Sequence, residues 1–130
     1  MAKDIAAQAE QVIQKLCGHD RNGKTVINLK TNQIRKFLTA VNTVTGKIEV
    51  YRAKHDLTDQ LPDDLAAEVK YLKIKIAYQA GREKAVKDFV NKAEMIKWID
   101  SIGNSVEKYE EFAKYVEALV AYHKYYGGKD

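Results

Sequence analysis

A basic and aromatic pattern runs along the segment between residues 71 and 82. Two tyrosines alternate with two basic residues at intervals of four, three and four positions: Tyr71, Lys75, Tyr78 and Arg82. A helix would place all four side chains on one face. Cationic groups neutralise phosphates and aromatic rings stack on unpaired bases, so the pattern favours contact with RNA or single-stranded DNA. Because tyrosine also serves as a half-buried core residue, this face alone is equally typical of packing between helices.

A polar strip between residues 32 and 55 offers related chemistry. Lysines and a threonine recur on the side away from the apolar residues: Lys36, Thr43, Lys47 and Lys54. Arg35, Thr39 and Asn42 form an adjoining strip. Such groups bond phosphate and sugar oxygens without reading bases. Taken alone, the strip is also what a solvated helix face looks like.

The chain carries little that could perform catalysis. Its three histidines, His19, His55 and His123, are scattered, and the single Cys17 has no partner for a CxxC pair. The sequence contains no HExxH, GxSxG, P-loop or GxGxxG motif. The carboxylates stand mostly beside lysines at helical spacing, which is typical of a solvated surface. The sequence therefore predicts a protein that is not an enzyme and that holds neither a metal nor a cofactor.

Length and composition indicate one domain spanning residues 1–130. Hydrophobic residues make up 45% of the chain and charged residues 31%, as in folded globular proteins. The 22 lysines and arginines exceed the 18 acidic residues by four, an excess that permits nucleic-acid binding without requiring it. No apolar run reaches the roughly 18 residues that cross a bilayer, and the first residues lack a signal-peptide core. We therefore expect a cytoplasmic protein without membrane contact.

Apolar residues at helical spacing predict an all-α fold, a single compact bundle of about five helices. The expected helices cover residues 3–17, 32–55, 62–81, 83–101 and 105–126. Thr31 is expected to cap the second helix, Gly81 to separate the third from the fourth, and Gly103 to end the fourth. Without that separation, the third and fourth helices would form a rod of about 58 Å, which is long for a domain of this size. Gly46 predicts a kink or a close contact within the second helix.

The apolar face of each expected helix should form the core. These faces comprise Ile5, Ala9, Val12 and Leu16; Ile34, Phe37, Leu38, Val41, Val44, Ile48 and Tyr51; Leu65, Val69, Leu72, Ile76 and Ala80; Ala85, Phe89, Ala93, Ile96 and Ile99 or Trp98; and Val106, Tyr109, Phe112, Val116, Leu119, Val120 and His123 or Tyr126. A second aromatic concentration favours packing between helices: Tyr115, Tyr122, Tyr125 and Tyr126. Gly127 and Gly128 are expected to end the last helix. Residues 19–24 predict a loop, and residues 25–29 could form either a short extended link or a single helical turn.

Three segments resemble a known family. Lys70–Glu83 and Phe112–Lys129 look like the small subunit of type III-A CRISPR effector complexes, and Thr31–Leu38 is similar to the N-terminal motif of that family. The aromatic-rich segment that ends in Gly-Gly-Lys is the most specific of the three. The resemblance covers nearly the whole chain in length and helix order, whereas residues 84–105 contribute little to it.

The resemblance implies a five-helix bundle that stacks in several copies beside crRNA, target RNA and the other subunits of the effector complex. Such a subunit contacts phosphates without sequence preference and cleaves nothing, because other subunits carry the catalytic activities. The residues expected to contact RNA are Arg35, Lys36, Lys75 and Arg82, with Lys73 and Lys124 as further candidates. Tyr78 would contact a sugar or pack between helices.

Two other classes of function fit parts of the pattern. In a pure protein-interaction module, the same basic and aromatic residues would meet acidic partner subunits or another copy of the chain. A helix-turn-helix regulator would place its recognition helix a short turn after a first helix. The expected loops are longer than that and no helix has a base-reading polar N-terminus, so this third class fits less well.

Overall fold

A computed structural model describes residues 4–128, and within them six helices and one short hairpin. The elements are α1 (Ile5–Leu16), β1 (Cys17–His19), β2 (Thr25–Ile27), α2 (Thr31–Lys54), α3 (Asp63–Arg82), α4 (Lys84–Ala93), α5 (Met95–Asp100) and α6 (Val106–Tyr125). The predicted all-α class is confirmed, with the two-stranded hairpin as the addition. Residue 3, the expected start of the first helix, and Lys129 lie outside the described residues.

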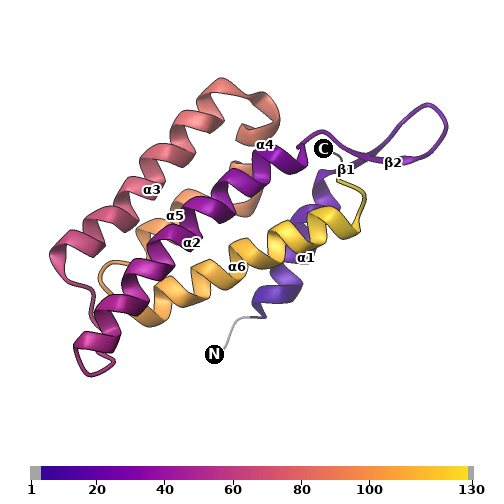
Figure 1. The fold of residues 1–130 in the computed structure, drawn as a ribbon. Helices are drawn as coiled ribbons and strands as arrows, with labels where there is room; N and C mark the ends of the chain where they lie inside the picture. Colours follow the sequence, from indigo (N-terminus) through magenta and orange to yellow (C-terminus); the bar gives the residue numbers. More distant parts are fainter. Residues whose placement is uncertain (1–3, 129–130) are drawn as a thin grey trace.

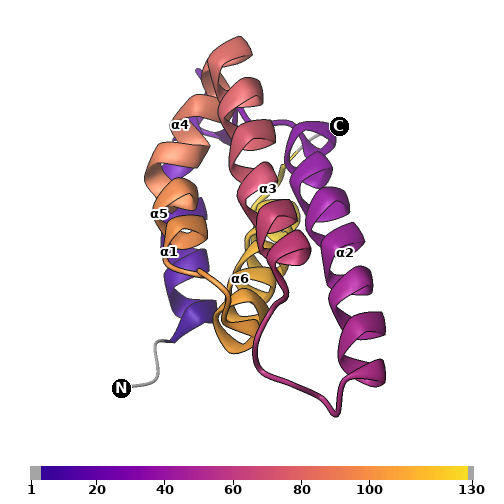
Figure 2. The same ribbon diagram turned by 90° about the vertical axis from the view of Figure 1, so that its left-hand side faces the viewer.

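Two groups of helices share α2. On one side α6 packs against α1 and α2, and on the other α3 packs against α2, α4 and α5. Figure 1 shows α2, α3 and α6 running alongside one another, with the β1–β2 hairpin projecting beyond the bundle. The perpendicular view keeps α2 and α3 side by side and places α4 and α5 on the other side of α3 (Figure 2).

The core contains residues of every predicted apolar face, together with others outside those faces such as Val86 and Val90. Phe37, Val41, Leu72, Ile76 and Phe112 are all at most 4% exposed. Removing an apolar side chain of this size from water contributes about 1.5–3 kcal/mol. Leu38, Tyr51 and Ala80, at the edges of the predicted faces, pack against this core while staying partly exposed.

Two tyrosines of α6 bring their hydroxyls into the core with partners. The Tyr109 hydroxyl donates to the Val41 carbonyl at 2.7 Å and lies 3.0 Å from the Thr45 hydroxyl. The Tyr115 hydroxyl donates to the Ala93 carbonyl at 2.8 Å, and its ring stacks on Trp98 with centroids 4.4 Å apart. For Tyr115, the predicted role in packing between helices is therefore confirmed.

The break between the third and fourth predicted helices lies two residues later than expected. Gly81 is inside α3, and the chain becomes extended at Glu83, with φ −132° and ψ 119°. The predicted fourth helix is itself two helices, because Glu94 adopts the left-handed conformation at φ 54°. Ala93 and Met95 are both buried, and a straight helix would place them about 200° apart. The kink at Glu94 lets both face the core.

The segment between the first two helices is a hairpin rather than a plain loop. Its strands pair antiparallel in the register Cys17 to Ile27, and Gly18 lies in the first strand. The Asp20 carboxylate accepts hydrogen bonds from the N–H groups of Asn22 and Lys24 and fixes the turn. Burial of Ile27 anchors the second strand against the bundle.

The predictions for Thr31, for Gly46 and for the glycines after α6 have different outcomes. Thr31 is the first residue of α2 rather than its cap, and Lys30 precedes the helix. Gly46 causes neither a kink nor a close contact: α2 continues through it, and a methyl group there would meet nothing within 4 Å. At the end of α6 the expected glycine cap is confirmed. Gly127 has φ 99°, and the Gly128 N–H bonds the His123 carbonyl at 2.8 Å.

Replacing Gly46 by alanine should stabilise the protein. The position is exposed, helical and free of neighbours, so alanine should raise the free energy of unfolding by up to about 1 kcal/mol. Urea denaturation measures this. Gly128→Ala is the opposite control, since its methyl carbon would lie 2.1 Å from the His123 ring and should destabilise the fold. A destabilised Gly46→Ala variant would contradict the unstrained geometry of α2.

The buried tyrosines should make stability fall at high pH. Burial raises the pKa of Tyr109 to about 12, and burial together with the nearby Glu94 carboxylate raises the pKa of Tyr115. Above pH 10 the unfolded chain loses these protons while the folded chain keeps them. Stability is therefore full below pH 10 and declines toward pH 12, by about 1.4 kcal/mol per pH unit for each proton. Urea denaturation at several pH values should give a shallower decline in Tyr109→Phe; an unchanged slope would contradict this.

Candidate nucleic-acid interface

A groove follows the line where α2 and α3 lie side by side. It consists of three adjoining hollows that share Ala40 and Lys75. Lys36, Lys75, Ile76 and Tyr78 help to line its middle. We call this surface the α2–α3 groove; its other polar lining residues are Thr31, Asn32, Arg35, Thr39, Thr43, Lys47, Glu68, Tyr71 and Gln79.

Helix periodicity explains why these side chains meet. On α2, Thr31, Arg35, Thr39 and Thr43 recur every four residues and form one stripe beside the apolar face. On α3, Lys75 stands one turn from both Tyr71 and Tyr78. The buried residues of the two helices form the floor, with Phe37 and Leu72 lining the same hollow. Core packing therefore brings two polar stripes to opposite walls of one groove.

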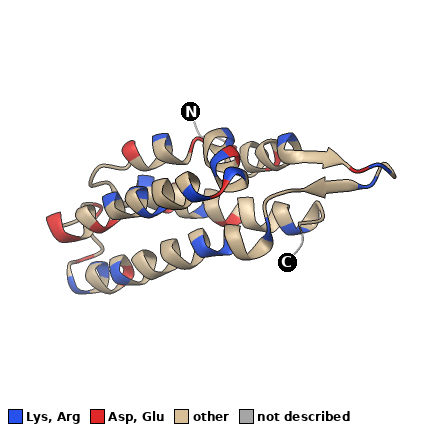
Figure 3. Ribbon diagram, turned by 90° about the horizontal axis from the view of Figure 1, so that it is seen from above, with Lys and Arg blue, Asp and Glu red and all other residues tan. Residues whose placement is uncertain are grey.

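The groove carries positive charge that no carboxylate neutralises. Within residues 4–128, Arg35, Lys36 and Lys75 form no ion pair. Glu68 is the acidic residue among the described lining residues, and it pairs with Lys47 at 2.7 Å. Figure 3 shows basic and acidic residues interspersed over the rest of the ribbon. The net charge of the whole chain is therefore small, although positive charge is in excess in the groove between α2 and α3.

Two cation–aromatic pairs stand along α3. The Lys75 Nζ lies 5.5 Å from the centre of the Tyr71 ring, and the Arg82 guanidinium lies 5.5 Å from the centre of the Tyr78 ring. Tyr71 is 55% exposed and Tyr78 62% exposed, so both rings remain open to a ligand. Through Tyr78, Arg82 is linked to the groove although it does not line it. All four residues of the predicted face thus lie together.

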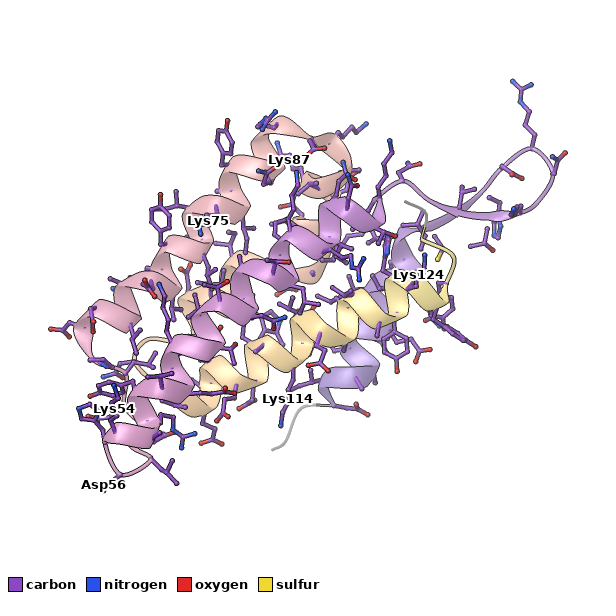
Figure 4. The ribbon with its side chains drawn as sticks, viewed as in Figure 1. Lys54, Asp56, Lys75, Lys87, Lys114 and Lys124 are labelled. Atoms are coloured by element: carbon purple, nitrogen blue, oxygen red, sulfur yellow. The ribbon has the colours of Figure 1, made fainter. Side chains whose placement is uncertain are left out.

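Two predicted contact residues lie elsewhere. Lys73 forms an ion pair with Asp100 of α5 at 2.8 Å, because its position is about 200° around α3 from Lys75. Lys124 lies on α6, and Figure 4 shows α2 between it and Lys75. The groove therefore contains Arg35, Lys36, Lys75 and Tyr78 directly and Arg82 as a neighbour, but neither Lys73 nor Lys124.

Some groove residues were not among the predicted contacts. Thr31 and Asn32 line the end of the groove at the start of α2. The four-residue spacing from Thr31 to Arg35 carries this information in the sequence. The predicted helix begins after Thr31, so this spacing does not include Thr31 in the predicted polar strip.

A separate hollow lies between α1, α5 and the first turns of α6. Its charged residues have both signs: Glu94, Glu107, Glu110, Glu111, Lys97, Lys108 and Lys114. Because acidic and basic groups are mixed there, this hollow lacks the positive excess of the α2–α3 groove.

The part of the chain that the structure describes has neither a cluster of metal-binding side chains nor a helix that could span a membrane. No group of three or more histidine, cysteine, aspartate or glutamate side chains is arranged to hold a metal ion within residues 4–128. Across the same residues, no helix combines the length and apolar character needed to span a bilayer.

Comparison with known proteins identifies close likenesses along almost the whole chain. The family model described as Csm2 Type III-A matches residues 4–129. The CRISPR system Cms protein Csm2 of Streptococcus thermophilus is 39% identical over 123 residues, which cover 95% of this chain and 91% of that protein. The protein of the same name from Mycobacterium tuberculosis is 36% identical over 127 residues, or 98% of this chain and 94% of that protein. In Enterococcus italicus, the like-named protein is 40% identical over 100 residues, covering 75% and 68% respectively.

Proposed function

The chain belongs to the Csm2 Type III-A family, the small subunits of type III-A CRISPR complexes, and on that premise we propose that it holds RNA by its backbone. The resemblance found in the sequence is thereby confirmed. The proposed ligands are crRNA and target RNA, bound without sequence preference. The subunit itself catalyses nothing, and several copies stack with other subunits to assemble the effector filament in the cytoplasm.

One observation carries the proposal: Arg35, Lys36 and Lys75 line the same groove and have no carboxylate partner among residues 4–128. A groove with unpaired cations on both walls attracts a linear polyanion and follows its backbone. Phosphate contacts position a protein on nucleic acid but carry no sequence information. Sequence would then be read by base pairing between guide and target.

The other groove residues support the same type of contact. Thr39 adds a hydroxyl group that can donate to phosphate or sugar oxygens, whereas the Thr43 hydroxyl donates to the Thr39 carbonyl at 3.1 Å. The exposed rings of Tyr71 and Tyr78 offer flat surfaces for sugars or unpaired bases, and such stacking tolerates any sequence. Hydroxyls, cations and exposed rings together match backbone binding better than base-edge recognition.

A protein-interaction role is the second candidate, and Ile74 is the observation that favours it. Ile74 is 60% exposed between Tyr71 and Tyr78 on α3, and a branched apolar side chain gains little from contact with phosphate. In this alternative, the same face of α3 would pack against another subunit, and RNA binding would not depend on Arg35 or Lys75.

Removing two groove charges should weaken RNA retention equally for all RNA sequences. In the double variant Arg35→Ala/Lys75→Ala, each lost phosphate contact should lower the salt slope of binding by roughly 0.7 for a single strand or 0.9 for a B-form duplex. The measurement is the affinity of the assembled effector complex for two unrelated target RNAs at two salt concentrations. Assembled complexes are needed because a multi-copy array supplies avidity that one copy lacks.

The matched control is Lys87→Ala/Lys114→Ala, which removes two charges from α4 and α6 at residues that do not line the groove. It should retain the wild-type affinity and salt slope. Loss of affinity for only one of the RNAs in the groove variant would refute the backbone mechanism. Failure of that variant to assemble, with normal RNA binding where assembly occurs, would instead support the protein-interaction role.

A further inference from the structure

The N-terminus of α2 opens onto one end of the α2–α3 groove. The first N–H groups of any helix have no acceptor within the helix. At α2 the Lys30 carbonyl satisfies the N–H groups of Gln33 and Ile34, at 3.0 and 3.2 Å. Within the described residues, the N–H groups of Thr31 and Asn32 form no hydrogen bond. Two donors therefore remain free beside the groove.

Two other helices have an acceptor side chain at their N-terminus. At α1, the Asp4 carboxylate accepts from the Ala7 N–H at 2.9 Å. At α6, the Ser105 hydroxyl accepts from the Lys108 N–H at 3.2 Å, and the Asp59 carboxylate accepts from the Glu107 N–H at 3.1 Å. These acceptors also offset the positive end of the helix dipole.

The first turn of α2 has basic residues around it and no acidic residue within it. Lys30 precedes it and caps nothing with its side chain, no acidic residue lies in the turn, and Arg35 and Lys36 follow. The nearest carboxylate interaction is that of Glu83 with the Gln33 side-chain amide. Gln33 lies about 200° around the helix from Thr31, so Glu83 neutralises the opposite side of the turn. The side facing the groove keeps its positive potential.

Thr31 provides an independent indication of a ligand. Thr31 is one of the residues that line the groove, it is only 7% exposed, and its buried hydroxyl oxygen has no hydrogen-bond partner within residues 4–128. Buried polar atoms are rarely left without a partner in native proteins, because an unpaired one is unfavourable. An incoming acceptor would satisfy this hydroxyl together with the N–H groups of Thr31 and Asn32.

We propose that the N-terminus of α2 is a binding subsite for one phosphodiester of the RNA backbone. The phosphate oxygens accept hydrogen bonds from the N–H groups of Thr31 and Asn32 and from the Thr31 hydroxyl, while Arg35 and Lys36 supply the opposite charge. Helix N-termini bind phosphates in this way through free N–H groups and the helix dipole. The inference rests on the proposed RNA-binding function and assigns one fixed phosphate position within the groove.

Thr31→Val tests the subsite, because valine keeps the shape of threonine and removes its hydroxyl. Since that hydroxyl has no hydrogen-bond partner among the described residues, thermal stability should stay the same or rise. RNA affinity of the assembled complex should fall about tenfold, equally for two unrelated RNAs. Thr31→Ser, which keeps the hydroxyl, should bind as the wild type does. Unchanged affinity in Thr31→Val would overturn the subsite.

A titration followed by amide resonances gives a second, direct measurement on the full chain. Inorganic phosphate and a short unstructured RNA should both shift the Thr31 and Asn32 amide resonances. The amides of Glu107 and Lys108 already have acceptors and serve as the internal control. Shifts spread equally over all helix N-termini, or confined to other residues, would show that phosphate does not select this site.

The outcomes separate the subsite from the groove itself. If Thr31→Val binds normally while Arg35→Ala/Lys75→Ala does not, the groove binds RNA but the subsite is wrong. If both variants bind normally, the proposed function fails and the subsite fails with it. Loss of binding in both, with Thr31→Val fully stable and Thr31→Ser normal, supports both.

Discussion

The packing of α2 against α3 is the constraint on which the proposed site depends. The two helices run antiparallel and bury Phe37, Val41, Leu72 and Ile76 between them and α6. Each helix has one orientation about its axis that buries its apolar residues. This orientation also determines where the polar side chains of the same helix lie. Arg35 and Lys36 are held on one wall and Lys75 on the other, separated by the small side chain of Ala40. Burial of apolar surface is thus the driving force that holds unpaired cations close together against their mutual repulsion.

Much of the helical pattern could be read from the sequence, because apolar spacing reports directly on burial. The structure departs from it where single residues take conformations that composition does not reveal. Glu94 is left-handed although it is neither glycine nor asparagine, and the break after α3 comes at Glu83 rather than Gly81. Thr31 has the residue type of a helix cap, but the helix begins with it. Such positions are decided by tertiary packing, which overrides local preference.

The candidate site was predictable only in part for the same reason. Sequence spacing places Tyr71, Lys75, Tyr78 and Arg82 on one face, and the structure places them there. Spacing does not say which helices become neighbours, so the meeting of Arg35 with Lys75 could not be derived from it. Lys73 and Lys75 differ by two residues, yet one is paired with Asp100 and the other is free of ion pairs among the described residues. Which lysines carry unpaired charge is a property of the fold.

The most direct test is a structure of the assembled effector complex with target RNA bound. The central claim is that the α2–α3 groove holds the RNA backbone. It predicts phosphate oxygens within about 3 Å of the Lys75 Nζ and the Arg35 guanidinium, and no hydrogen bonds from these groups to base edges. A groove covered by a neighbouring protein subunit, with the RNA passing along another face of the bundle, would contradict the account.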